Sequence, residues 1–174
     1  MLKMKRVTKL PVNGLLTEID TMELTEGKKA PAFTAVDQEG QKVTLADFKG
    51  KKLALYFYPK DDTSTCTVQA CNLRDGFSDL KAKGIEVIGV SPDDGNSHLK
   101  FIAKHELPFR IIADTDKKLV EKYGVWGEKQ LYGNKYMGVF RTTFLIDEAG
   151  KIVKIIAKPK VKVHADEIAA GFGL

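Results

Sequence analysis

The two cysteines of this 174-residue chain, Cys66 and Cys71, are the side chains with the most distinctive potential chemistry. Cys66 follows the residues Thr-Ser-Thr at 63–65, which are typical of a helix start, so we expect its thiol in the first helical turn. Free N–H groups and the positive end of the helix dipole favour a thiolate there, which is the nucleophilic form. The polar loop over residues 60–64 argues against an inert buried thiol. The sequence therefore predicts that Cys66 is a nucleophile.

Cys71 lies five positions further along the same expected helix. Ideal helix geometry separates two such Cα atoms by about 8–9 Å and places them roughly 140° apart around the axis. A disulfide needs Cα atoms within about 7 Å, so the sulfurs cannot join while the helix is intact. Either Cys71 is a packing residue or the helix unwinds locally during a redox cycle. Gly76, inside the helical pattern, costs about 1 kcal/mol relative to alanine and makes opening easier.

The elements that must position these thiols follow from the apolar pattern. Continuous apolar runs over residues 53–58 and 85–90 predict two buried strands. Between them, residues 63–83 carry apolar side chains at helical spacing and are followed by Gly84, a helix stop. The other expected elements are a hairpin over 33–44, helices over 96–105, 117–123 and 164–172, a strand over 109–113, and a second hairpin formed by 139–147 and 151–157.

This order of elements predicts an α/β fold with a central mixed sheet flanked by helices and an N-terminal β-hairpin. The crossover places the start of the expected 63–83 helix at the carboxyl end of a central strand, where open α/β sheets have their sites. We expect one domain over residues 22–174. Residues 1–21 are expected to form a loosely ordered extension, with Met22 as a candidate natural first residue.

Arg141 is anomalous because it interrupts the apolar pattern VFRTTFLID, which we expect to form a strand. A guanidinium is costly to bury there unless it is paired or functional. Its positive charge would favour a neighbouring thiolate and stabilise charge that develops on a reacting oxygen.

Pro59, Thr63 and Cys66 stand at the spacing of the peroxiredoxin motif PxxxTxxC. With YFYPKDDTSTCTVQACNLRD around this motif and a second cysteine five residues on, the chain resembles the Q-type peroxiredoxins, also called bacterioferritin comigratory proteins. The segments APAF, SPDDGNSHLKF, YGVWGEK and RTTFLID extend the resemblance from Met22 to the C-terminus.

The resemblance implies a thioredoxin-like peroxiredoxin fold and reduction of hydrogen peroxide and organic hydroperoxides without a cofactor. By this resemblance Cys66 is the peroxidatic cysteine and Cys71 the resolving one, joined in an intramolecular disulfide. Thr63 bonds the thiolate or the peroxide, Pro59 shields the pocket from water, and Arg141 approaches Cys66 from a neighbouring strand. The implied partners are the peroxide and a thioredoxin or similar dithiol reductant, and the implied state is a monomer.

One departure from the family concerns the residues just before Cys66. Ser64-Thr65 stands where the family has Pro-Gly, and a β-branched Thr65 could crowd a ligand that approaches the backbone. Gln69 stands where the family has Glu or Gln, and a bond from it to Arg141 is a weaker expectation.

Two other functions compete with the peroxidase. A thioredoxin-like protein-disulfide oxidoreductase would use CxxC, in which the sulfurs join without unfolding, whereas the spacing here is CxxxxC. A non-enzymatic binding module on the same fold would leave the coincidence of the motif residues unexplained. Peroxide consumption separates the enzyme from the binding module, and insulin reduction separates the two oxidoreductases.

Composition and charge argue against nucleic acid, a membrane or a metal ion as a partner of this chain. The net charge is +5, and the lysines of residues 151–162 lack interleaved aromatic residues, so we expect a charged edge strand that includes Pro159 and no nucleic-acid binding. No apolar run approaches the roughly 20 residues of a membrane helix. The three histidines are scattered, so no metal site is expected. The acidic pairs 61–62 and 93–94 are expected to be solvated turns. Two cysteines and no signal-peptide pattern predict a cytoplasmic protein.

Overall fold

The computed structural model describes residues 24–174, and the extension expected over residues 1–21 lies outside this part of the chain. Its strands are β1 (Thr34–Val36), β2 (Lys42–Thr44), β3 (Lys52–Phe57), β4 (Ile85–Ser91), β5 (Arg110–Ala113), β6 (Trp126–Leu131), β7 (Asn134–Val139), β8 (Thr142–Ile146) and β9 (Ile152–Ile156). Its helices are a 3-10 turn η1 (Leu45–Phe48) and the α-helices α1 (Ser64–Asp75), α2 (Phe77–Ala82), α3 (Gly95–His105), α4 (Lys118–Lys122) and α5 (His164–Gly171).

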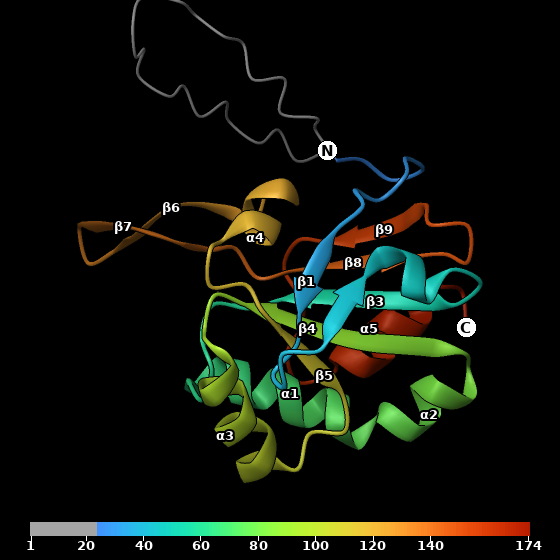
Figure 1. The fold of residues 1–174 in the computed structure, drawn as a ribbon, viewed down its shortest axis with the longest axis horizontal. Coiled ribbons are helices and arrows are strands. Elements are labelled where there is room, and N and C mark those ends of the chain that lie inside the picture. Colours follow the sequence, from blue (N-terminus) through green and yellow to red (C-terminus); the bar gives the residue numbers. More distant parts are fainter. Residues whose placement is uncertain (1–23) are drawn as a thin grey trace, which may run out of the picture.

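A mixed five-stranded sheet forms the centre, with the strand order β5-β4-β3-β8-β9 (Figure 1). The apolar run that predicted a central strand is β3, which pairs in parallel with β4 and antiparallel with β8. Leu55 lies opposite Ile88 on one side and Phe144 on the other. The predicted α/β fold with its N-terminal hairpin, β1–β2, is confirmed.

The two faces of the sheet carry separate apolar cores because alternate side chains of a strand point to opposite faces. Leu53, Leu55 and Phe57 pack under the β1–β2 hairpin, η1 and α4. Ala54 and Tyr56 pack under α1, α2, α3 and α5. Helix α1 is therefore fixed to the sheet by a buried face, directly after the strand that occupies the centre.

The single helix expected over residues 63–83 is wrong: it is broken into α1 and α2 at Gly76. A Cβ atom at Gly76 would lie 2.4 Å from the Cβ atom of Ala165 in α5, so only glycine permits this approach. The close packing of α5 lies far away in the chain, which is why helical spacing did not reveal the break. The predicted stop at Gly84 is correct, with a φ of +74°.

A hairpin of β6 and β7 was not predicted and extends away from the sheet (Figure 1). Its turn exposes Leu131 and Tyr132, so it lacks the alternating buried pattern that marks most strands. The strand expected over 139–147 is also wrong at its start, because Val139 ends β7 and β8 begins at Thr142. Arg141 thus lies in the connection between two strands, where a partly exposed guanidinium is tolerated.

The C-terminal part of the chain closes one face of the sheet through α5. The Asn72 side chain on α1 donates to the carbonyl of Lys162 at 2.8 Å and accepts from the N–H of Ala165 at 2.8 Å. These two bonds attach the last turns of α1 to the first residues of α5.

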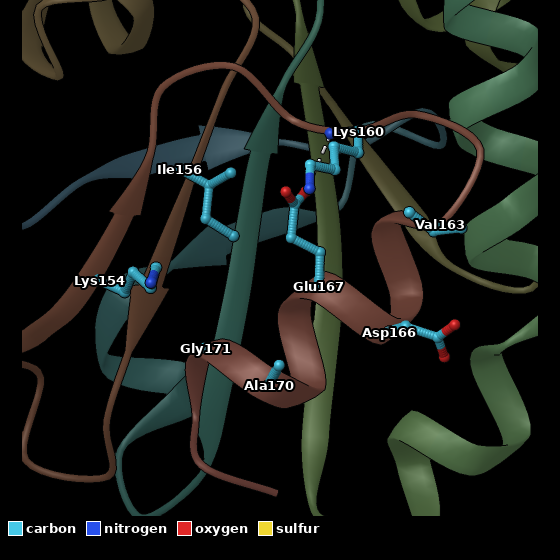
Figure 2. Close-up of a pocket in the computed structure, with 8 residues that line it drawn as sticks. All are labelled: Lys154, Ile156, Lys160, Val163, Asp166, Glu167, Ala170 and Gly171. Atoms are coloured by element: carbon cyan, nitrogen blue, oxygen red, sulfur yellow. Dashed lines mark hydrogen bonds between the residues drawn. The ribbon is translucent and has the colours of Figure 1, made fainter.

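The lysine-rich segment forms an edge strand only in part. Strand β9 is an edge strand, but it ends at Ile156. Pro159 and the later lysines lie beyond it, so the prediction that they belong to the edge strand is wrong. A groove of about 410 Å³ lies between β9 and α5. Figure 2 shows the residues that line it, among which Glu167 accepts a hydrogen bond from the N–H of Lys160. The same carboxylate lies 2.7 Å from the ring of buried His164, so this end of the molecule is held by a local polar network.

Candidate active site

Cys66 lies in the first turn of α1, as predicted, and its thiol is buried. Thr63 is the N-terminal capping residue, and the first intrahelical bond runs from the N–H of Thr67 to the Thr63 carbonyl. The N–H of Cys66 is therefore one of the helix donors without an intrahelical partner. This position favours negative charge on the sulfur.

Arg141 approaches Cys66 across 75 positions of sequence. Its Nη2 atom donates to Cys66 Sγ at 3.1 Å, and its Nη1 atom donates to the Gln69 side-chain oxygen at 2.5 Å. Gln69 is fully buried one turn after Cys66, and its amide nitrogen has no partner among the described residues. The expected bond between Gln69 and Arg141 is thus present. A guanidinium held in this way stabilises a thiolate and can bond oxygen atoms beside it.

Thr63 and Pro59 flank the thiol on the loop between β3 and α1. The Thr63 hydroxyl is exposed and donates to the Lys60 carbonyl at 3.0 Å, which leaves its oxygen lone pairs free to accept a bond. Pro59 is half-buried, one residue after the fully buried Tyr58. Ser64 and Thr65, which replace the family's Pro-Gly, are both exposed at the helix start.

Cys71 lies on another side of α1, is partly exposed, and is a free thiol like Cys66. Its sulfur is 3.9 Å from the Nδ1 atom of His105 at the end of α3. The intact helix over Ser64–Asp75 contains both cysteines, so the separation deduced from ideal helix geometry applies. In this conformation the two sulfurs face different neighbours.

The expectation that the acidic pair 61–62 forms a solvated turn is wrong for Asp61. Its carboxylate is buried and accepts bonds from Tyr58 at 2.5 Å, Ser97 at 2.7 Å and His98 at 2.7 Å. The other ring nitrogen of His98 faces the carbonyl of Ile112 at 3.1 Å. The ring of His98 therefore bridges the Asp61 carboxylate and the backbone of β5. Sequence reasoning missed this network because Ser97 and His98 lie 36 and 37 positions from Asp61.

The network fixes the loop that carries the site. Burial raises the pKa of Tyr58 well above its ordinary value, so this phenol stays protonated and donates to Asp61. The backbone N–H of Asp61 in turn donates to Asp93 at 2.7 Å. The active-site loop is thereby tied to the end of β4 and to α3, which holds the beginning of α1 in place.

Lys129 on β6 is a second cation near the thiol that sequence reasoning missed. Burial, followed by the charge of Arg141, lowers its pKa, whereas the charge of Cys66 acts in the opposite direction. Its ammonium donates to the Val139 carbonyl at 2.9 Å. A hollow of about 330 Å³ lies beside it, lined by Lys129, Phe140, Arg141, Ala157, Lys158 and Pro159.

Other classes of site lack support in the described residues. No three His, Cys, Asp or Glu side chains of residues 24–174 gather as metal ligands. Over the same span, each helix is too short or too polar to traverse a bilayer. The chemistry that the geometry does support is nucleophilic attack by a thiolate beside a guanidinium, at the start of a helix.

Comparison with known proteins identifies the class. The AhpC/TSA family matches residues 26–155, and the chain belongs to this family. It is similar to the putative peroxiredoxin bcp of Coxiella burnetii, with 47% identity over 147 residues that cover 84% of this chain and 97% of that protein. It is also 44% identical to the peroxiredoxin Bcp of Bacillus subtilis over 84% of this chain and 93% of that one.

A solved structure gives the same result for the fold. A cysteine-to-serine mutant of Xylella fastidiosa PrxQ superposes with a TM-score of 0.81 at 28% identity, covering 87% of this chain and 96% of that chain. The resemblance to Q-type peroxiredoxins is therefore confirmed. The chain has the thioredoxin-like fold of these enzymes and is a thiol-dependent peroxidase; the alternative of a protein-disulfide oxidoreductase is not favoured.

Proposed function

We propose that Cys66 is the peroxidatic cysteine and that Arg141 activates it. The observation that carries this assignment is the 3.1 Å contact between Arg141 Nη2 and Cys66 Sγ at the start of α1. The Cys66 thiolate attacks one peroxide oxygen and the O–O bond breaks, which converts the sulfur to a sulfenic acid; the leaving oxygen takes up a proton from solvent and departs as water or an alcohol. Arg141 stabilises the charge that develops on the leaving oxygen. Thr63 offers a hydroxyl to the peroxide, and Pro59 limits access of water.

The proposed substrates are hydrogen peroxide and organic hydroperoxides. A structure of the Xanthomonas campestris bacterioferritin comigratory protein that addresses its alkyl peroxide reduction activity matches with a TM-score of 0.75 at 33% identity over 81% of this chain and 90% of that one. The hollow beside Arg141 includes Phe140 and Pro159, which suit an alkyl group.

Cys71 is proposed as the resolving cysteine, which condenses with the sulfenic acid to form an intramolecular disulfide. A thioredoxin or a similar dithiol then reduces this disulfide. Because both sulfurs belong to one chain, the cycle needs no second copy, and we propose a monomer built from residues 22–174. Two free thiols suit a reducing compartment, so we propose the cytoplasm.

The assignment is tested with Cys66→Ser and Cys71→Ser in a peroxide-consumption assay followed by mass spectrometry. Cys66→Ser should abolish turnover because no other residue can supply the nucleophile. Cys71→Ser should complete the first turnover, then accumulate sulfenic acid that progresses to sulfinic acid under excess peroxide. A tenth of normal turnover in Cys66→Ser, or an oxidised wild type without a Cys66–Cys71 disulfide, contradicts the respective role.

A further inference from the structure

The thiol of Cys71 faces a histidine rather than the other cysteine. Cys71 Sγ and His105 Nδ1 are 3.9 Å apart, although the residues lie on different helices and 34 positions apart in the chain. The His105 side chain is 17% exposed, so its ring is held in a partly buried position. A thiol beside an imidazole nitrogen is the basic unit of an activated cysteine.

Asp62 binds the opposite side of the same ring. Its Oδ1 atom lies 3.0 Å from His105 Nε2, and its Oδ2 atom accepts from Lys104 at 2.7 Å. The hydrogen bonds from Lys104 and then from His105 lower the pKa of Asp62, so its carboxylate is ionised and only accepts. His105 Nε2 therefore donates to Asp62, and Nδ1 is the ring atom that faces the Cys71 thiol.

The backbone supports this arrangement at both residues. Asp62 has a φ of 56°, in the left-handed region that few non-glycine residues adopt but that aspartate tolerates. Arg74 on α1 donates to the carbonyl of His105 at 2.8 Å. The end of α3, the middle of α1 and the active-site loop are thus joined around one imidazole.

We propose that His105 is a catalytic residue of the resolution step, in which its Nδ1 atom takes the proton of Cys71, and that Asp62 is its positioning residue. This inference rests on the proposed functions of Cys66 and Cys71. The array of Cys71, His105 and Asp62 has the roles of a nucleophile, a base and an orienting carboxylate.

The step balances without any further reactant. The S–H bond of Cys71 and the S–O bond of the Cys66 sulfenic acid break, and an S–S bond forms. Cys71 sulfur is oxidised and Cys66 sulfur is reduced, and the departing hydroxide leaves as water with the proton that His105 accepted. The proton leaves Cys71 while α1 is folded, so the segment that unwinds carries a thiolate ready to attack.

Several other charged side chains lie near the His105 ring and can affect the pH dependence of disulfide formation. Lys104 and Arg74 are the neighbouring cations, and both favour a thiolate at Cys71. The nearby anions besides Asp62 are Asp75, which pairs with Arg74 at 3.0 Å, and Glu106, which follows His105 in the chain.

The test measures the two chemical steps separately in the full chain. Reduced protein is mixed with one equivalent of hydrogen peroxide, the reaction is stopped at successive times with a thiol-alkylating reagent, and mass spectrometry quantifies the Cys66–Cys71 disulfide. Competition with a second peroxidase gives the rate of Cys66 oxidation. The variants are His105→Gln and Asp62→Asn, and the matched control is Lys100→Gln, which removes an exposed lysine from the same helix α3.

We expect His105→Gln to slow disulfide formation by about 100-fold at neutral pH, the lower end of general-base effects, with Cys66 oxidation unchanged. The deficit should shrink as the pH rises past about 8.5, where free thiols ionise without a base. Asp62→Asn should show a smaller deficit with the same recovery, and Lys100→Gln should stay within about twofold of wild type.

Three results would overturn the inference. Disulfide formation at the normal rate or faster in His105→Gln shows that no base is needed. Equal slowing at every pH shows a packing role. A wild type that oxidises Cys66 but forms no Cys66–Cys71 disulfide removes the proposed role of Cys71 itself, which distinguishes failure of the proposed function from failure of the base.

Discussion

Arg141 holds Cys66 and Gln69 at once, with one guanidinium nitrogen on the sulfur and the other on the amide oxygen. Since Cys66 and Gln69 are three residues apart, they lie on the same face of α1. The guanidinium therefore spans one helical turn, and its orientation toward the thiol depends on an amide that takes no part in the chemistry.

Arg141→Ala should slow the oxidation of Cys66 by about 100- to 1,000-fold, the usual cost of losing one donor to a developing oxyanion. Rapid mixing with limiting peroxide measures this rate, and circular dichroism checks the fold. Arg110→Ala is the matched control, because Arg110 lies on the edge strand β5 and pairs with Asp37. Equal rates in wild type and Arg141→Ala would show that Arg141 is structural.

Gln69→Leu should slow the same step by about tenfold, because Arg141 keeps its charge but loses the bond that orients it. The decisive measurement is a double-mutant cycle with Arg141→Ala. If Gln69 acts through Arg141, its substitution has no further effect once the arginine is absent. Additive losses would instead mean that Gln69 affects the thiol independently.

His98→Gln should destabilise the protein by about 2–3 kcal/mol, because it removes a buried ring that bonds both the Asp61 carboxylate and the Ile112 carbonyl. Urea unfolding measures this loss. Asp94→Ala is a useful comparison on the same helix: Asp94 caps α3 through a bond to the N–H of Ser97, and caps contribute about 1 kcal/mol. Equal losses in the two variants would contradict a structural role for the buried His98 ring.

His164 should make stability fall in mild acid. Burial, the largest cause, lowers its pKa in the folded state, and its ring is held between Glu167 and Thr143. The unfolded chain, with an ordinary pKa near about 6.5, then binds the proton more readily. The stabilising contribution is thus complete above about pH 6.5 and is lost as the pH falls through the lower folded pKa.

The measurement for this prediction is the free energy of unfolding from urea titrations between about pH 7.5 and 5, for wild type and His164→Gln. The difference between the two proteins isolates His164 from the other histidines. A difference that does not shrink toward acid pH is incompatible with the lowered pKa.

The sequence was informative wherever local patterns decide structure. Strand β3 is buried on both faces, so its continuous apolar run was sufficient to place it at the centre of the sheet. The position of Cys66 also followed from neighbouring residues, since helix starts depend on the few residues around the cap.

The features that were predicted wrongly or not at all share a different cause, because they depend on contacts between distant segments of the chain. The break at Gly76 depends on Ala165, and the burial of Asp61 depends on His98. The β6–β7 hairpin extends from the sheet and stays mostly exposed, so its strands lack the alternating buried pattern that would have marked them. The proximity of Cys71 and His105 also required the three-dimensional packing of two helices.

If the proposed Cys66–Cys71 disulfide forms, the two bonds of the Asn72 side chain connect that change to the end of the chain. Asn72 follows Cys71 directly, so release of Cys71 from α1 pulls on the bonds to Lys162 and Ala165. Oxidation at residue 66 would then loosen the beginning of α5, almost one hundred positions downstream. A protease that cleaves only loosened backbone near residues 160–165 would report the oxidation state of a cysteine that it never contacts.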